Sequence, residues 1–93
     1  MRTVLITGTS TGIGQVTAKY MASKGWRVFA TMRNLEKKEP LEKMMRDAGV
    51  AEQVTFETLD VGDPKSIETA VSNTLAHTGG TLDAVVHNAG VAI

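Results

Sequence analysis

The chain has 93 residues, 42% of them hydrophobic and 22% charged, as expected of one globular domain and unlike a disordered segment. Its ten basic and ten acidic residues cancel, which excludes a general electrostatic attraction to nucleic acid or to an anionic membrane. It contains no cysteine, and Thr7 and Gly8 interrupt its first apolar run too early for a signal peptide or a membrane span. We therefore expect a cytoplasmic protein with no membrane or nucleic-acid partner.

The first half of the chain alternates strand-like and helix-like segments. Residues 3–7, TVLIT, are β-branched and almost wholly apolar, which predicts a strand buried on both faces. A helix is expected to follow the glycines of residues 8–14 and to end at Lys24 and Gly25. Its apolar stripe, at helical spacing, consists of Ile13, Val16, Thr17, Tyr20 and Met21. Residues 26–31, WRVFAT, predict a second strand.

A second helix and a third strand follow. Residues 41–48 predict a helix that starts next to Pro40 and ends at Gly49. The i,i+4 charge pairs expected on its solvated face are Glu39–Lys43 and Glu42–Arg46. Residues 53–60, QVTFETLD, predict the third strand.

The last helix carries the clearest end signals. Asp63 is expected to cap it, Pro64 to be its first residue, and Gly79 with Gly80 to end it. Its apolar stripe consists of Ile67, Ala70, Val71, Thr74 and Leu75. Residues 82–90, LDAVVHNAG, predict a fourth strand that runs into a turn.

Strands that alternate with helices across short connections predict one α/β domain over residues 1–93. Right-handed crossovers then make the sheet parallel and place helices on both of its faces, in three layers. The order expected for the four strands is 3-2-1-4, as in doubly wound sheets.

The glycines between the first strand and the first helix predict a phosphate-binding loop. Gly8 lets the chain turn off the strand, Gly12 lets a pyrophosphate approach the backbone, and Gly14 lets the helix pack closely. Unpaired N–H groups at the helix start, around Ile13, would point at that phosphate. Gln15 follows where a P-loop would have lysine. The alternative is a turn whose glycines only bend the chain.

Three motifs resemble the short-chain dehydrogenase/reductases. TGTSTGIG (residues 7–14) matches their TGxxxGxG motif, HNAG (87–90) matches NNAG, and LDV (59–61) is similar to the stretch that meets the adenine ring. The resemblance covers this whole chain but less than half of a typical member, and it implies a Rossmann-type fold that is incomplete here. The cofactor-binding residues that it and the loop chemistry imply are Gly8, Ser10, Thr11, Gly12, Ile13, Gly14, Arg33, Asp60, Val61, Asn88, Ala89 and Gly90.

The end of the second strand predicts which cofactor binds. NAD-preferring folds usually place a carboxylate there for the 2′-hydroxyl, whereas this chain has Met32 and then Arg33. A guanidinium attracts a 2′-phosphate through charge-assisted bonds of about 1.5–3 kcal/mol each. Ser10 matches the loop serine that meets this phosphate in NADP-preferring members, including some steroid dehydrogenases. We therefore expect NADP(H) to be favoured over NAD(H), although Arg33 could instead be an ordinary surface arginine.

Two other strand ends carry candidate residues. Asp60 either accepts a bond from the adenine amino group, with the Val61 backbone beside it, or organises the turn toward Gly62. The family resemblance implies that Asn88, Ala89 and Gly90 line the adenine-ribose side and steady the sheet. His87 is interpreted as a strand-end residue, and no metal ligand is expected because no second ligand lies nearby in the sequence.

A tyrosine–lysine pair on the first helix imitates the family's catalytic spacing. YMASK places Tyr20 four residues before Lys24, but about two turns along a helix that leads away from the phosphates. Tyr20 is therefore expected in the core. The resemblance implies that the family's catalytic asparagine, serine, tyrosine and lysine lie beyond Ile93, so no catalytic residue is expected in this chain.

The preferred interpretation is the N-terminal portion of an oxidoreductase that moves hydride between NADPH and a carbonyl or secondary alcohol, inactive by itself. Its fourth strand would be an open edge that favours pairing with another copy, so a homo-oligomer is possible. The alternatives are a freestanding module that binds or senses NADPH, and an α/β unit without a ligand. The last leaves the glycine loop, Arg33 and residues 88–90 unexplained together.

Overall fold

The computed structural model describes residues 1–10 and 12–88. Its strands are β1 (Thr3–Ile6), β2 (Arg27–Met32), β3 (Val54–Thr58) and β4 (Ala84–Val86), and its α-helices are α1 (Gly12–Ser23), α2 (Glu39–Asp47) and α3 (Pro64–Thr78). Two short 3-10 helices, η1 (Leu35–Lys37) and η2 (Ala51–Gln53), lie in the connections around α2. Every expected strand and helix is present, in the expected order.

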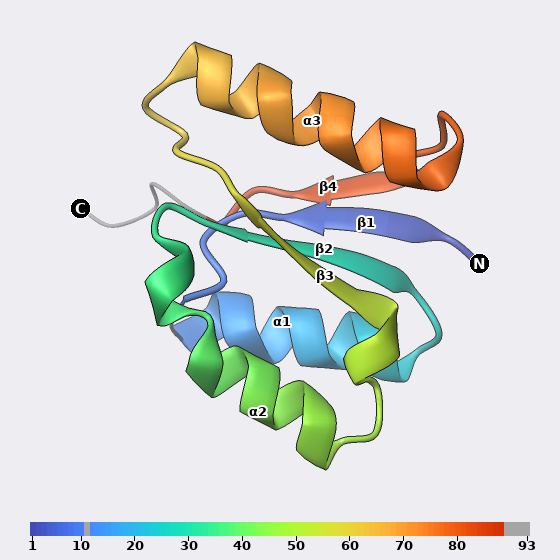
Figure 1. The fold of residues 1–93 in the computed structure, drawn as a ribbon. Coiled ribbons are helices and arrows are strands. Elements are labelled where there is room, and N and C mark those ends of the chain that lie inside the picture. The colour runs from blue at the N-terminus through green and yellow to red at the C-terminus, as the bar shows by residue number, and fades with distance from the viewer. Residues whose placement is uncertain (11, 89–93) are drawn as a thin grey trace.

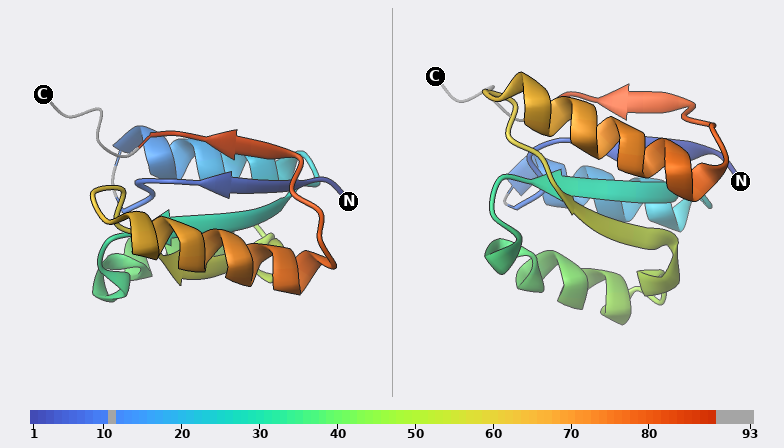
Figure 2. Two further views of the ribbon diagram at one scale, coloured as in Figure 1. Left: turned by 90° about the horizontal axis from the view of Figure 1, so that it is seen from above. Right: turned by 45° about the horizontal axis from the view of Figure 1, so that its top comes forward.

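The strands form one parallel sheet in the order β3-β2-β1-β4. Figures 1 and 2 show α1 and α2 on one face of this sheet and α3 on the other, which makes three layers. The predicted fold class and strand order are confirmed. Because all four strands are parallel, their carboxyl ends lie along one edge of the sheet, where ligands bind in open α/β folds.

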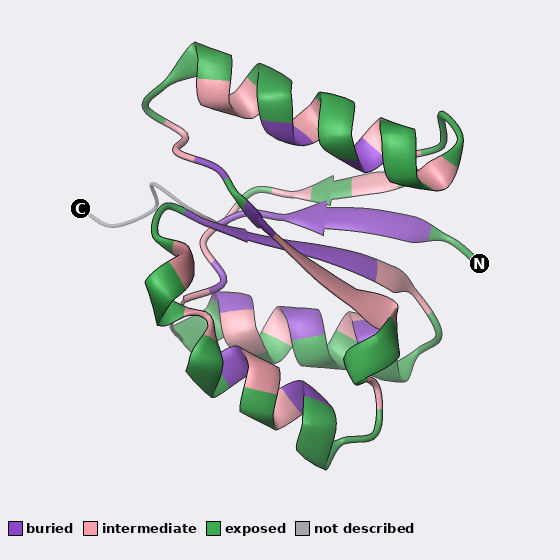
Figure 3. Ribbon diagram, in the orientation of Figure 1, coloured by how far each residue is buried: buried purple, intermediate pink, exposed green. Residues whose placement is uncertain are grey.

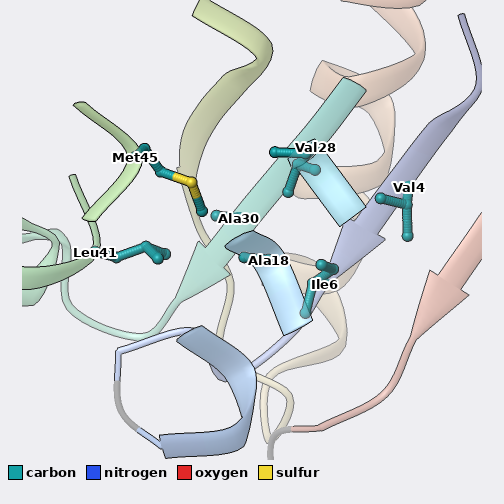
Figure 4. Packing of buried hydrophobic residues seen from close by; sticks show 8 residues of the cluster. Val4, Ile6, Ala18, Val28, Ala30, Leu41 and Met45 are labelled. Carbon is teal, nitrogen blue, oxygen red and sulfur yellow. The ribbon is translucent and has the colours of Figure 1, made fainter. Parts of the chain in front are cut away.

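The core has two parts, one on each face of the sheet. Successive strand residues point to opposite faces, so Val4 and Ile6 face α1 and α2 while Leu5 faces α3. Figure 4 shows the larger part, and Figure 3 shows that β1 is buried throughout. The residues of the larger part are Val4, Ile6, Ala18, Ala22, Val28, Ala30, Leu41 and Met45. The strand buried on both faces is therefore confirmed.

The buried face of α1 differs from the expected one. Its buried residues are Gly14, Ala18 and Ala22. Three large residues of the expected stripe point outward: Ile13 is 74% exposed, Val16 63% and Tyr20 59%. Met21, as expected, packs partly buried against the core. The prediction that Tyr20 lies in the core is therefore wrong. The physical reason is distance, because α1 lies so close to the sheet that only glycine and alanine fit between them.

The ends of α3 form as predicted. The Asp63 side chain accepts a hydrogen bond of 3.0 Å from the Lys65 N–H and caps the helix, with Pro64 as first residue. Gly79 ends it in the left-handed conformation, at a φ of 72°. On α2 the Glu42–Arg46 pair forms at 3.7 Å, but Lys43 pairs with Asp47, at 3.1 Å, in place of Glu39.

Strand β4 lies at the edge of the sheet, as expected, and is short. Among the described strands it pairs only with β1, through three residues, and its central Val85 is 52% exposed. In the described part of the chain, no helix has both the length and the apolar character needed to traverse a bilayer.

The face that α1 buries can be tested with two substitutions on that helix. Ala18→Leu should lower the free energy of unfolding by about 1–3 kcal/mol, because a larger side chain must enter a fully packed interface. Tyr20→Ala should change it by less than about 0.5 kcal/mol, because the ring is mostly exposed. Urea unfolding measures both, and the reverse ranking would mean that the outer stripe faces the core.

Candidate cofactor site

The candidate residues gather at the carboxyl edge of the sheet. The connection from β1 to α1, the residues after β2 and β3, and His87 with Asn88 after β4 all leave the sheet at this edge (Figure 1). Segments up to 81 residues apart in sequence are hydrogen-bonded here. The topology therefore brings the glycine loop, Arg33, Asp60 and Asn88 to one side of the molecule.

Threonine side chains anchor the glycine loop to β2. The N–H and the hydroxyl of Thr9, a fully buried residue, both donate to the Thr31 carbonyl, each at 3.0 Å. The Thr31 hydroxyl in turn donates to the Ile6 carbonyl at 2.8 Å. Sequence reasoning missed Thr9 and Thr31. A hydroxyl between Gly8 and Ser10, or after the apolar residues of the second strand, does not specify a partner.

Asn88 fastens the end of β4 to the same loop. Its backbone N–H donates to the Thr7 hydroxyl at 2.9 Å, and its side-chain Nδ2 donates to the Gly8 carbonyl at 3.1 Å. The Thr7 N–H adds a bond of 3.0 Å to the Val86 carbonyl. The amide of Asn88 therefore holds the glycine loop and the fourth strand together.

The three glycines of the loop serve different geometric needs. Gly8 and Gly12 have φ values of 68° and 56°, a conformation that other residues rarely adopt. A β-carbon at Gly14 would lie 2.8 Å from the Gly8 carbonyl carbon and 2.9 Å from Asn88 Nδ2, and it would overlap the Gly8 carbonyl oxygen. A β-carbon at Gly12 would meet no other residue within 4 Å among those described, so this side of the loop is open to a ligand.

The start of α1 suits an anion. The first N–H groups of an α-helix have no acceptor within the helix, and the helix dipole gives them a positive partial charge. The first turn of α1, at Gly12, Ile13 and Gly14, contains no acidic residue that would compete for them. This arrangement can bind a phosphate group.

The end of β2 offers a positive charge and no carboxylate. Met32 is buried with only 1% of its surface exposed, and Arg33 follows it, exposed. Beside Ser10 lies an open hollow of about 620 Å³. Its other lining residues, two lysines, two glutamates and a proline, are Glu36, Lys37, Glu39, Pro40 and Lys43. The opposite charges of these lining residues balance.

Asp60 organises the turn after β3. Its Oδ1 accepts a bond of 2.9 Å from the Gly62 N–H, and its carbonyl accepts one of 2.9 Å from the Asp63 N–H. Its own N–H donates to the Ser66 hydroxyl at 2.8 Å. The expected turn toward Gly62 is confirmed. Among residues 1–10 and 12–88, no hydrogen bond reaches Oδ2, so a contact from Asp60 to adenine remains a prediction. Val61 packs against the α3 side of the core.

The remaining candidates fall into two groups. Thr11, Ala89 and Gly90 lie outside the described residues, so their assignment stays a prediction. His87 is exposed at the end of β4, and Lys24 lies over the Tyr20 ring at 5.5 Å on the outer face of α1. Tyr20 lies roughly 12 Å along the helix axis from Gly12, at about 1.5 Å per residue. The tyrosine–lysine pair is therefore separate from the loop.

The sheet order and the glycine loop define a Rossmann-type nucleotide-binding α/β fold. The profile of the short chain dehydrogenase family matches residues 2–93. The chain belongs to this family, whose members are oxidoreductases.

Relatives and solved structures agree with that membership. A short-chain dehydrogenase of Penicillium crustosum is 46% identical over 90 residues, which are 96% of this chain and 31% of that protein. Retinol dehydrogenase 11 of Homo sapiens is 38% identical over 97% of this chain and 28% of its own length. A variant of actinorhodin polyketide ketoreductase, solved with NADPH, has a TM-score of 0.85 and 34% identity over 96% of this chain and 33% of its own. The chain thus spans about a third of the length of these proteins.

The close packing at Gly14 is testable by adding one methyl group. Gly14→Ala should destabilise the fold by about 1–3 kcal/mol, because the backbone of Gly8 and the Asn88 amide must move away. Alanine also stabilises a helix by about 1 kcal/mol relative to glycine. The measured loss of unfolding free energy will therefore be smaller than the cost of the steric overlap alone. Chemical denaturation gives the value.

A matched control for Gly14→Ala is Gly62→Ala. A β-carbon there would lie 3.4 Å from Asp60 Oδ1, an ordinary contact, so stability should change by less than about 0.5 kcal/mol. Equal effects at the two positions would show that no close packing exists at Gly14.

Proposed function

We propose that this chain binds NADP(H) in preference to NAD(H), as the cofactor-binding part of an oxidoreductase that transfers hydride between NADPH and a carbonyl or secondary alcohol. The observation that carries the proposal is the glycine loop, fixed by Thr9 and Asn88 at the start of α1 with an open side at Gly12. The ketoreductase with a similar fold, solved with NADPH, adds support.

The residues of this chain would hold the cofactor in three ways. Backbone N–H groups of the first turn of α1, at Gly12, Ile13 and Gly14, would bind the diphosphate. Asp60 Oδ2 and the Val61 backbone would meet the adenine, and Asn88 would line the adenine-ribose side together with Ala89 and Gly90. The nicotinamide supplies the hydride when bound, and the protein orients it.

The preference for the phosphorylated cofactor would arise from Arg33 and Ser10. A 2′-phosphate adds up to two negative charges, which a carboxylate at the end of β2 would repel, and Met32 stands there instead. Arg33 is exposed and, in the described ranges, engaged in no hydrogen bond or ion pair, so its forked donors are available. Ser10 would add a neutral donor from the loop.

The cofactor preference is tested by titrating the protein with NADPH and with NADH. NADPH should bind about tenfold or more tightly, because each charge-assisted bond contributes about 1.5–3 kcal/mol. Arg33→Ala should remove most of this difference by weakening NADPH and leaving NADH nearly unchanged.

Arg46→Ala is the matched control for Arg33→Ala, because Arg46 is exposed on α2 and paired with Glu42. It should leave both affinities unchanged. Equal affinity of the unmodified protein for the two cofactors, or an Arg33→Ala variant that keeps the NADPH preference, would contradict the proposal.

The 93-residue chain by itself should bind NADPH without oxidising it. Its one tyrosine, Tyr20, lies on the outer face of α1, away from the loop, and cannot donate a proton beside the nicotinamide. The near-ultraviolet absorbance of NADPH should therefore stay constant when simple ketones are added. Substrate-dependent loss of that absorbance, abolished in Tyr20→Phe, would show that the chain is catalytic.

A further inference from the structure

We propose that Gln15 is a positioning residue that holds Ser10 where the loop can recognise the 2′-phosphate of the cofactor. This inference rests on the proposed function, because it concerns the same site. Gln15 directly follows the three-glycine motif and is not one of the residues proposed to contact the cofactor.

The contact that carries the inference is a single hydrogen bond. Gln15 Nε2 donates to the Ser10 carbonyl at 2.8 Å, and both residues are partly buried. Gln15 lies in the first turn of α1, directly after Gly14, whose backbone is pressed against Gly8 and Asn88. The donor therefore extends from a rigidly held position.

Ser10 has few other restraints. The loop residues before it are fixed by Thr9, bonded to Thr31, and by Gly8, bonded to Asn88. Within residues 1–10 and 12–88, Ser10 makes no hydrogen bond other than the one from Gln15. Removing it would leave the Ser10 backbone free to rotate next to the open hollow that Ser10 lines.

The chemistry at position 15 requires a donor. The Ser10 carbonyl is an acceptor, so an amide N–H satisfies it, whereas a thioether or a carboxylate at this position cannot. The bond to Ser10 uses one of the two N–H groups of Nε2 and fixes the direction of the amide. We infer that the effect of Gln15 on the cofactor passes through the placement of Ser10. The change should therefore appear in the discrimination between NADPH and NADH, since only NADPH carries the phosphate that Ser10 meets.

The test is Gln15→Met, a side chain of similar length without the donor, in the 93-residue chain. The ratio of NADPH to NADH affinity should fall about three- to tenfold, the effect of losing one neutral hydrogen bond. Lys19→Met, one turn further along α1 at an exposed position, is the matched control and should leave the ratio unchanged. Gln15→Leu, which is uncharged and favours the helix, is a second variant without a donor.

A double-mutant cycle separates positioning from a general structural role. In a Ser10→Ala background, Gln15→Met should lower the affinity ratio no further, because the group it positions is gone. Additive effects of the two substitutions would overturn the inference. So would an unchanged ratio in Gln15→Met and Gln15→Leu, or an equal loss of affinity for both cofactors.

Failure of the proposed function gives a different result. If the unmodified protein binds neither cofactor, or binds both equally, the assignment of the site fails before any variant is measured. If the unmodified protein prefers NADPH and Gln15→Met leaves the affinity ratio unchanged, only the role of Gln15 is refuted.

Discussion

The close packing of the first turn of α1 against the Gly8 carbonyl and the Asn88 amide is the constraint on which the rest of the structure depends. It requires glycine at position 14, and one and two turns later it requires the alanines Ala18 and Ala22. It also places the helix N-terminus at the carboxyl edge of the sheet, where unpaired N–H groups can meet an anion. Core packing and anion binding thus share one contact.

Threonine hydroxyl groups fix the glycine loop that connects β1 to α1. Thr7, Thr9 and Thr31 have the β-branched shape that suits strands, and their hydroxyls bond to backbone groups in neighbouring segments. In the described part of the chain, no buried side-chain nitrogen or oxygen lacks a partner. These bonds hold residues 7–9 of the loop in place, so a ligand would not have to order them when it binds.

Local sequence patterns predicted the helix ends and the order of the elements. They did not predict the features that depend on how closely two elements pack or on contacts between distant residues. The cap at Asp63, the left-handed Gly79 and the element order follow from residue types a few positions apart. The buried face of α1 could not be predicted this way, because the helix has one row of large apolar residues and another of glycine and alanine. Only the short distance between the helix and the sheet decides that the row of small residues is buried. The partner of Thr9 lies 22 residues away and those of Asn88 lie 80 and 81 residues away, so a hydroxyl or amide in the sequence does not identify them.

The charges around the candidate site do not by themselves favour the phosphorylated cofactor. The chain is neutral overall, and the lysines and glutamates around the hollow beside Ser10 balance, so no broad field favours an extra phosphate. In the proposed function, helix α1 would attract the diphosphate that NADP and NAD share and would not distinguish the two cofactors. Arg33 would distinguish them, but it is exposed, and solvent and salt weaken the attraction of an exposed charge. The proposed discrimination would therefore need a short-range contact as well, which Ser10 would supply while its backbone is held in place.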